Sequence, residues 1–202
     1  MTRSRSSPYK RPDHFTREAK RAGFPARSVF KLEEIDRRVH LLRPGMCVLD
    51  LGAAPGSWSL YAAQKIGVSG KLLAVDLSPL GTVLPAQATF LQGDALSLED
   101  GQVAAFAPYD VVLSDMAPST TGAKTVDQAR SFELFMRALA VAGTLVRPGG
   151  SFVGKLFMSE ELREARSSLK GLFAEERLIR PEGTRSVSTE LFVVGLGRKK
   201  AA

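Results

Sequence analysis

The chain has 202 residues, 44% of them hydrophobic, so it can bury one substantial core, and its length favours a single domain. Its 28 Lys and Arg residues outnumber its 21 Asp and Glu residues, and the resulting formal net charge of +7 indicates a polyanionic partner such as nucleic acid or an anionic membrane surface. The single cysteine, Cys47, excludes an internal disulfide, and His14 and His40 lack neighbours at ligand spacing, so we expect no protein-held metal.

The N-terminal part of the chain is basic. Residues 1–13 are rich in Ser, Pro and basic residues, a composition that buries little, so we expect a flexible tail. No apolar stretch follows it as in a secretory signal, and no run is long enough to span a membrane, so we expect a soluble, cytoplasmic protein with no membrane contact. Residues 14–38 are predicted to form helical pieces. We expect one domain over 14–202 that begins with a basic helical segment, 14–42.

From residue 46 onward, short apolar runs alternate with longer helical patterns. The runs predict strands at 46–51, 71–76, 87–91, 109–114, 151–157 and 189–196, and helices at 57–66, 97–106, 125–146 and 160–173. This alternation predicts an α/β fold, a mainly parallel sheet with helices on both faces. Ligands of such sheets bind at the carboxyl ends of the strands, so the loops that follow the strands are the candidate site.

The first of these loops is made almost entirely of small residues. It runs from Gly52 to Gly56 within the string VLDLGAAPGSW. Glycine tolerates positive φ and adds no bulk, so a ligand can approach the main chain closely. The glycine spacing differs from the dinucleotide fingerprint G-x-G-x-x-G, which argues against hydride chemistry. Trp58 follows the loop, and its sequence position is compatible with either a core residue or a ligand contact.

Charged residues mark the ends of the later strands. Asp76 and Asp94 follow the second and third strands, where together they favour a nucleoside, with Asp76 accepting hydrogen bonds from a ribose diol and Asp94 near the base. Either acid alone is more typical of a helix cap or a loop. Asp115 ends the fourth strand, and Lys155 lies inside an otherwise apolar fifth strand. A buried lysine is costly unless it is paired or functional, and Asp115 is its natural partner.

Five strings, taken in order, resemble the FtsJ/RrmJ family of S-adenosylmethionine-dependent ribose 2′-O-methyltransferases, whose bacterial members act on large ribosomal RNA. The strings are RSVFKLEEID (27–36), VLDLGAAPGSW (48–58), LSDMAP (113–118), GGSFVGKLF (149–157) and STELFVVGLG (188–197). We therefore expect a doubly wound, Rossmann-like methyltransferase fold with a mostly parallel seven-stranded sheet and an antiparallel last strand. The resemblance implies S-adenosyl-L-methionine as cofactor and, as substrate, a uridine in the A-loop of 23S ribosomal RNA within the 50S subunit. We expect a monomer.

The resemblance also implies roles for particular residues. The family's catalytic set falls on Lys31, Asp115, Lys155 and Glu190. The cofactor contacts fall on Gly52, Gly56, Trp58, Asp76, Asp94 and Asp115. A ribose 2′-hydroxyl is a poor nucleophile, so methyl transfer needs a base or a group that orients the oxygen, and Lys155 is the candidate for either role. Asp115 is expected to position Lys155, and Glu190 to orient a lysine or the target ribose.

RNA contacts are expected on the basic N-terminal region. The candidates are Lys10, Arg11, Arg17, Lys20, Arg21 and Arg27. Such contacts neutralise phosphates without choosing a base, so selectivity must come from the shape of the folded RNA. Two alternatives stay open: methylation of transfer RNA or another ribosomal site, and an RNA-binding assembly factor without activity. The four intact catalytic positions argue against the second.

One loop departs from the family pattern. Members commonly carry Asn followed by Met-Ser-Gly after SDMAP, whereas this chain has Ser119, Thr120 and Thr121 before Gly122. The segment 77–88 is also compressed, and we expect it to give the adenine pocket a different shape.

Overall fold

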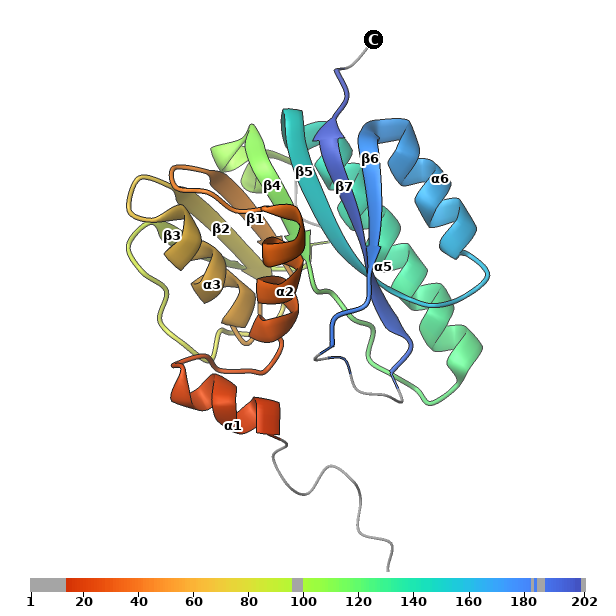
Figure 1. Ribbon diagram of the computed structural model, residues 1–202, viewed down its shortest axis with the longest axis horizontal. Helices are drawn as coiled ribbons and strands as arrows, with labels where there is room; N and C mark the ends of the chain where they lie inside the picture. The colour runs from red at the N-terminus through yellow and green to blue at the C-terminus, as the bar shows by residue number, and fades with distance from the viewer. Residues whose placement is uncertain (1–13, 96–99, 183, 185–187, 201–202) are drawn as a thin grey trace, which may run out of the picture.

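The computed structural model describes residues 14–95, 100–182, 184 and 188–200 (Figure 1). The predicted tail, 1–13, with Lys10 and Arg11, lies outside the described residues. The helices are α1 (His14–Arg21), α2 (Val29–Val39), α3 (Ser57–Ile66), α4 (Asp100–Val103), the 3₁₀-helix η1 (Ala104–Phe106), α5 (Lys124–Leu145) and α6 (Leu162–Leu172). The strands are β1 (Cys47–Leu51), β2 (Lys71–Asp76), β3 (Ala88–Gln92), β4 (Tyr109–Ser114), β5 (Val146–Phe157), β6 (Phe173–Ile179) and β7 (Glu190–Arg198).

The strands form one seven-stranded sheet in the order β3-β2-β1-β4-β5-β7-β6. Strands β1 to β5 pair in parallel, and β7 runs antiparallel between β5 and β6. The prediction of a mostly parallel sheet with an antiparallel last strand beside the fifth is confirmed. The strand order reverses between β1 and β4, so the carboxyl ends of these two strands form the switch point where ligands bind in open α/β sheets.

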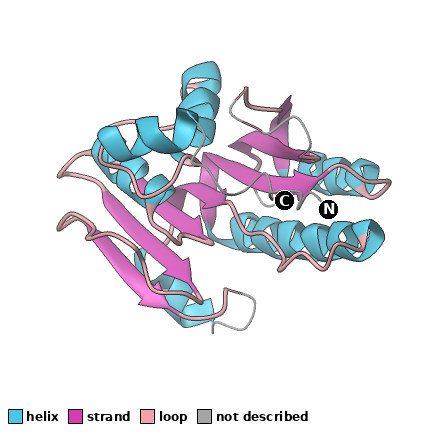
Figure 2. Cartoon of the chain, turned by 90° about the horizontal axis from the view of Figure 1, so that it is seen from below, coloured by secondary structure: helices cyan, strands magenta, loops and turns pink. Residues whose placement is uncertain are grey.

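Helices cover both faces of the sheet (Figures 1 and 2). Along β1, Val48 packs in the same cluster as Leu32 of α2 and Trp58 of α3. The next residue, Leu49, packs instead in the cluster that contains Phe135 of α5. Successive side chains of a strand point to opposite faces, so β1 is apolar except for Asp50 because both of its faces are covered.

The basic N-terminal segment is part of this packing. Val29, Leu32 and Ile35 of α2 and Ala19 of α1 are buried in the cluster on the α3 side of the sheet. The segment therefore uses its apolar face to hold α1 and α2 on the domain, which leaves most of its basic residues exposed: Arg17, Lys20, Arg21, Arg37 and Arg38.

Two predicted elements differ from the structure. The sequence predicts no strand directly after the helix expected at 160–173. In the structure, α6 ends at Leu172 and the strand β6 begins at the next residue. The helix predicted at 97–106 is described only from residue 100, as the short α4 and η1.

No helix in the described part of the chain is both long enough and apolar enough to cross a membrane. Within the same residues, no group of three or more His, Cys, Asp or Glu side chains gathers where it could hold a metal ion.

Candidate active site

A cavity of about 490 Å³ lies at the switch point, over the carboxyl ends of β1, β2 and β4. Several residues predicted from the sequence line it together: Gly52, Asp76, Asp94, Asp115 and Lys155. Ala54, Leu77, Met116, Ala117 and Leu134 are among the other lining residues. The mixture of acidic groups, backbone and apolar side chains is typical of a site for a nucleoside-containing ligand.

The small residues of the first loop are required by close packing at the base of this cavity. Gly52 has φ +79°, and a Cβ at this position would lie 2.7 Å from Cγ of Met116. The N–H groups of Gly52 and Ala53 both donate to the carbonyl of Val75, at 2.9 and 3.0 Å. The loop is therefore pressed between the ends of β2 and β4 with no room for a side chain at Gly52. Gly56 has φ +109° and meets Thr82 in the same way, outside the cavity.

Asp76 organises the loop as well as lining the cavity. Its Oδ2 accepts a hydrogen bond from the N–H of Ala54 at 2.9 Å, and its Oδ1 accepts one from the N–H of Ser78 at 2.8 Å. Each carboxylate oxygen has a second lone pair, so both can still accept a hydrogen bond from a ligand. Asp76 therefore fixes the loops after β1 and β2 relative to each other and faces the cavity at the same time.

The indole of Trp58 does not line the cavity. Its ring is buried, packs on Phe192 with centroids 5.5 Å apart, and donates its N–H to the carbonyl of Ser28 at 2.8 Å. Of the two roles left open for Trp58, the side chain takes the one in the core, where it fastens the start of α2 to α3 and β7. A cofactor could contact Trp58 only through its main chain.

The predicted pair of Asp115 and Lys155 is present at the edge of the cavity. Nζ of Lys155 lies 3.0 Å from Oδ1 of Asp115 and also donates to the Asp115 carbonyl. Lys155 is only 7% exposed. A cation buried to this degree needs a partner, and Asp115 supplies both a charge and a backbone acceptor.

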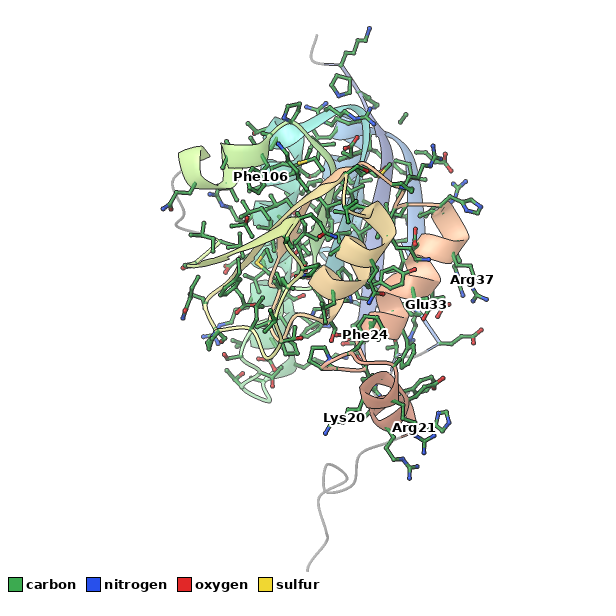
Figure 3. All side chains as sticks on the ribbon, turned by 90° about the vertical axis from the view of Figure 1, so that its left-hand side faces the viewer. Lys20, Arg21, Phe24, Glu33, Arg37 and Phe106 are labelled. Carbon is green, nitrogen blue, oxygen red and sulfur yellow. The ribbon has the colours of Figure 1, made fainter. Side chains whose placement is uncertain are left out.

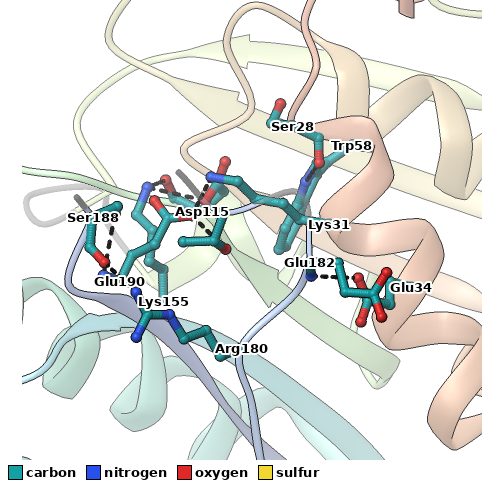
Figure 4. Close-up of polar contacts among 11 residues, drawn as sticks. Ser28, Lys31, Glu34, Trp58, Asp115, Lys155, Arg180, Glu182, Ser188 and Glu190 are labelled. Carbon is teal, nitrogen blue, oxygen red and sulfur yellow. Dashed lines mark hydrogen bonds and ion pairs between the residues drawn. The ribbon is translucent and has the colours of Figure 1, made fainter. Parts of the chain in front are cut away.

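The other two predicted catalytic residues form a second ion pair. Lys31 of α2 pairs with Glu190 of β7, and both side chains are nearly buried. Glu190 lies opposite Phe157 in the antiparallel ladder between β5 and β7, and Phe192 lies opposite Lys155. Residues two apart share a face, so Lys155 and Glu190 project from neighbouring strands on the side where α2 packs. Figure 4 shows the two pairs beside each other.

A second cavity, of about 730 Å³, opens on the Lys31–Glu190 side of this cluster. Pro25, Ala26, Arg27, Thr120, Lys124, Gln128, Phe157, Ser188 and Thr189 are among its lining residues. The four charged residues therefore separate two cavities: Asp115 and Lys155 face the first, and Lys31 and Glu190 face the second.

The predicted RNA contacts within the described residues lie near the second cavity or on α1. Arg27 lines the cavity. Arg17, Lys20 and Arg21 are exposed on α1, and Figure 3 shows Lys20 and Arg21 projecting from the end of the molecule. The segment that leads from α1 into α2 therefore supplies both the exposed basic side chains of α1 and part of the cavity lining.

Sequence reasoning missed two buried acids that shape the site. Asp50 in β1 is fully buried, accepts a hydrogen bond from Ser59 at 2.6 Å, and has one oxygen, Oδ1, without a hydrogen-bond partner among the described residues. Burial raises the pKa of Asp50 to about 7, against the effect of the Ser59 hydrogen bond. Asp127 in α5 accepts hydrogen bonds from Thr121 and Gly122 and so holds the divergent loop at 119–122. The acid within the apolar run VLDL was the available signal for Asp50.

The fold and the two cavities define a Rossmann-like methyltransferase domain. The chain belongs to the FtsJ-like methyltransferase family, whose model matches residues 24–198. It is 69% identical over 195 residues to the ribosomal RNA large subunit methyltransferase E of Sorangium cellulosum, covering 96% of this chain and 92% of that protein. It is 48% identical over 195 residues to the protein of the same name from Bdellovibrio bacteriovorus, covering 95% and 99%. The resemblance carried by the five strings and the prediction of a methyltransferase enzyme are thereby confirmed.

Solved structures agree on the fold. A putative ribosomal RNA methyltransferase from Plasmodium falciparum superposes with a TM-score of 0.77 at 21% identity, over 88% of this chain and 100% of that one. Fibrillarin from Aeropyrum pernix, solved with bound S-adenosyl-L-methionine, superposes with a TM-score of 0.63 at 17% identity, over 84% and 76%.

Proposed function

We propose that this enzyme transfers a methyl group from S-adenosyl-L-methionine to the ribose 2′-hydroxyl of a uridine in the A-loop of 23S ribosomal RNA, acting in the cytoplasm as a monomer on the 50S subunit. The observation that carries the proposal is the cluster of Lys31, Asp115, Lys155 and Glu190 between two cavities. One cavity suits the methyl donor and the other the nucleotide that receives the methyl group. The names of the curated relatives support ribosomal RNA of the large subunit as the substrate.

The residues of the 490 Å³ cavity fit the proposed cofactor. Asp76 can accept hydrogen bonds from ribose hydroxyls, Asp94 lies where it can reach the base, and the glycine loop leaves main chain open to a ligand at Gly52. Asp115 can hold the amino end of the methionine part. When bound, S-adenosyl-L-methionine supplies an electrophilic methyl group on a positively charged sulfur. For Gly56 and Trp58 we propose only main-chain contacts with the cofactor, because Gly56 has no side chain and the Trp58 indole does not line the cavity.

Lys155 is proposed to act directly on the ribose 2′-hydroxyl. Its Nζ can hold the hydroxyl oxygen in line with the methyl group and take the proton that the oxygen loses as the new O–C bond forms. The carboxylate and the carbonyl of Asp115 fix the position of Nζ.

The second cavity is proposed to hold the target nucleotide. The ion pair between Lys31 and Glu190 holds both side chains in place. From the second cavity they can bind the ribose hydroxyls, whereas Lys155 faces the first cavity. Arg27 and Lys124 line the cavity where they can neutralise the flanking phosphates, and Arg17, Lys20 and Arg21 extend the basic surface along α1. A nucleotide in this cavity must leave its stack, so an RNA loop suits the site better than a duplex.

The test is methyl transfer from labelled S-adenosyl-L-methionine to 50S subunits from a strain lacking the enzyme, to deproteinised RNA and to transfer RNA. Label in 23S RNA as a 2′-O-methyl nucleotide, lost in Lys155→Ala, would support the reaction and the residue. Lys170→Ala, on α6 at the opposite face, is the matched control and should keep activity. Label in transfer RNA alone would identify transfer RNA, and not 23S RNA, as the substrate. No label with intact cofactor binding would favour the assembly-factor reading.

A further inference from the structure

The connection between β6 and β7 is fastened to α2 at both of its ends. At its start, the N–H of Glu182 donates to Oε2 of Glu34 at 2.8 Å, across 148 residues of sequence. At its finish, Glu190 pairs with Lys31. Lys31 and Glu34 are three residues apart on α2 and therefore share a face of the helix. Figure 4 shows both attachments.

Glu34 is built into this position rather than solvated. It is 7% exposed, although it is a carboxylate on a surface helix, and its other oxygen pairs with the exposed Arg38 one turn further along. Burial of a carboxylate is costly unless hydrogen bonds and charge compensate it. The adjacent Glu33 is exposed, so the same residue type one position away does not meet these contacts.

Internal bonds couple the two ends of the connection. Arg180 donates to the carbonyl of Ser188 at 2.7 Å, and Oγ of Thr184 lies 3.3 Å from Oε1 of Glu190. Thr184 is two residues from Glu182, so its hydrogen bond to Glu190 connects the position of Glu182 to that of Glu190. Ser188 and Glu190 line the second cavity, and Glu190 completes the catalytic cluster.

We propose that Glu34 is a positioning residue for methyl transfer: by accepting the Glu182 N–H it holds the chain beside Thr184, which contacts Glu190, so that Glu190 meets Lys31 and its part of the wall of the second cavity is set. The proposal rests on the proposed function for its effect on the reaction, but the tether itself belongs to the free protein. Glu34 does not touch substrate in this scheme and acts only through Glu182 and Glu190.

The test compares four variants for turnover and for amide hydrogen exchange in the free enzyme. Glu34→Ala should lower kcat by about 10-fold to 100-fold, the range expected when a catalytic group is misplaced by about 1 Å. Its affinity for S-adenosyl-L-methionine, measured by calorimetry, should be unchanged, and exchange at the Glu182 amide should accelerate. Glu34→Gln keeps an acceptor for this N–H and should restore most of the loss. Arg38→Ala and Glu33→Ala, which leave the acceptor in place, should stay within about threefold of the parent enzyme.

Several outcomes would overturn the proposal. One is a kcat of Glu34→Ala within about twofold of the parent, and another is unaltered hydrogen exchange at the Glu182 amide in that variant. The proposal would also fail if Glu34→Gln or Arg38→Ala lost as much activity as Glu34→Ala. If Glu34→Ala does not fold, Glu182→Pro deletes the same donor without altering α2 and should give the same kinetic loss. If the parent enzyme methylates no RNA, the proposed function fails, but hydrogen exchange still decides whether the tether exists.

Discussion

The carboxyl group of Asp50 makes the free energy of unfolding depend on pH. Its pKa, 3.8 for an ordinary aspartate, is raised to about 7, first by burial and then by repulsion from Asp115 and Asp76. The folded state therefore keeps the proton over a range in which the unfolded state has lost it. The free energy of unfolding must fall as the pH rises through this window, and the penalty is complete above about 7.

We expect Asp50→Asn to remove this component and to stabilise the protein at alkaline pH by a few kcal/mol, because one pKa unit corresponds to about 1.4 kcal/mol. Urea unfolding of parent and variant, on the acidic and the alkaline side of the window, measures it. Ser59→Ala removes a hydrogen bond that lowers the pKa of Asp50, so in this variant the fall in the free energy of unfolding should extend to higher pH. Equal pH dependence in parent and Asp50→Asn would contradict the assignment.

The role of Lys155 can be tested by changing its ability to lose a proton. Lys155→Arg keeps a positive charge that can hold the 2′-hydroxyl, but a guanidinium does not accept a proton at accessible pH. If Lys155 takes the proton, kcat should fall by about 10²-fold to 10⁴-fold, the usual contribution of general acid–base catalysis. A variant with kcat near that of the parent would restrict Lys155 to orienting the oxygen. Unchanged cofactor affinity is the control.

At the scale of elements, the loop between β4 and α5 is held by one acid. Asp127 accepts hydrogen bonds from the N–H and Oγ of Thr121, at 2.8 and 2.9 Å, and from the N–H of Gly122 at 3.2 Å. The backbone hydrogen bond from Thr121 is the main reason that the pKa of Asp127 is lowered. Thr120 and Gly122 line the second cavity, so Asp127 sets part of its wall.

We expect Asp127→Ala to release this wall and to raise KM for RNA several-fold, while the dissociation constant for S-adenosyl-L-methionine stays unchanged. Steady-state kinetics with RNA and calorimetry with the cofactor separate the two effects. Thr144→Ala, on the last turn of α5, is the control because its side chain donates to the Ala140 carbonyl of the same helix. A rise in KM for the cofactor instead of the RNA would contradict this assignment, because it would mean that the loop borders the first cavity.

The strand β6 shows what local pattern could not predict. Its sequence FAEERLI has three consecutive charged residues in the middle and continues directly from α6, so the local pattern predicts no strand there. It lies at the edge of the sheet and pairs only with β7, and charged residues are common on such edges because they oppose further strand pairing. The central strands were predictable because burial on both faces makes them mostly apolar.

At the scale of the whole molecule, the positive charge is expected to dominate RNA affinity. Replacing Arg17, Lys20 and Arg21 on α1 by Ala should weaken RNA binding and make it less dependent on salt, by roughly one unit of log–log slope for each lost phosphate contact. Filter binding over a series of salt concentrations measures this. A variant on α6 that replaces the exposed Arg163 and Lys170, and leaves Arg166 paired with Glu176, should change the slope far less. Equal slopes in the parent and the α1 variant would remove α1 from the RNA surface.

Much of the active site followed from topology, because residues after successive parallel strands must meet at one edge of the sheet. Lys155 was recognisable as a cation in an apolar strand. The supporting acids were not, since Glu34 and Asp127 fix the loops by accepting hydrogen bonds from main-chain N–H groups, which every residue type but proline carries. An acid that accepts a hydrogen bond from a remote loop looks, in sequence, like an acid that faces water. Only the folded chain distinguishes Glu34 from Glu33.

The burial of Trp58 has a spectroscopic consequence. It is the only tryptophan in the chain, and its indole is held between Phe192 of β7 and the Ser28 carbonyl that precedes α2. Its fluorescence therefore reports on a single place, the seat of α2 on the sheet. Release of α2 would expose the ring to water and shift its emission to longer wavelength, while α5 and α6 on the other face could unfold or stay folded without a direct signal.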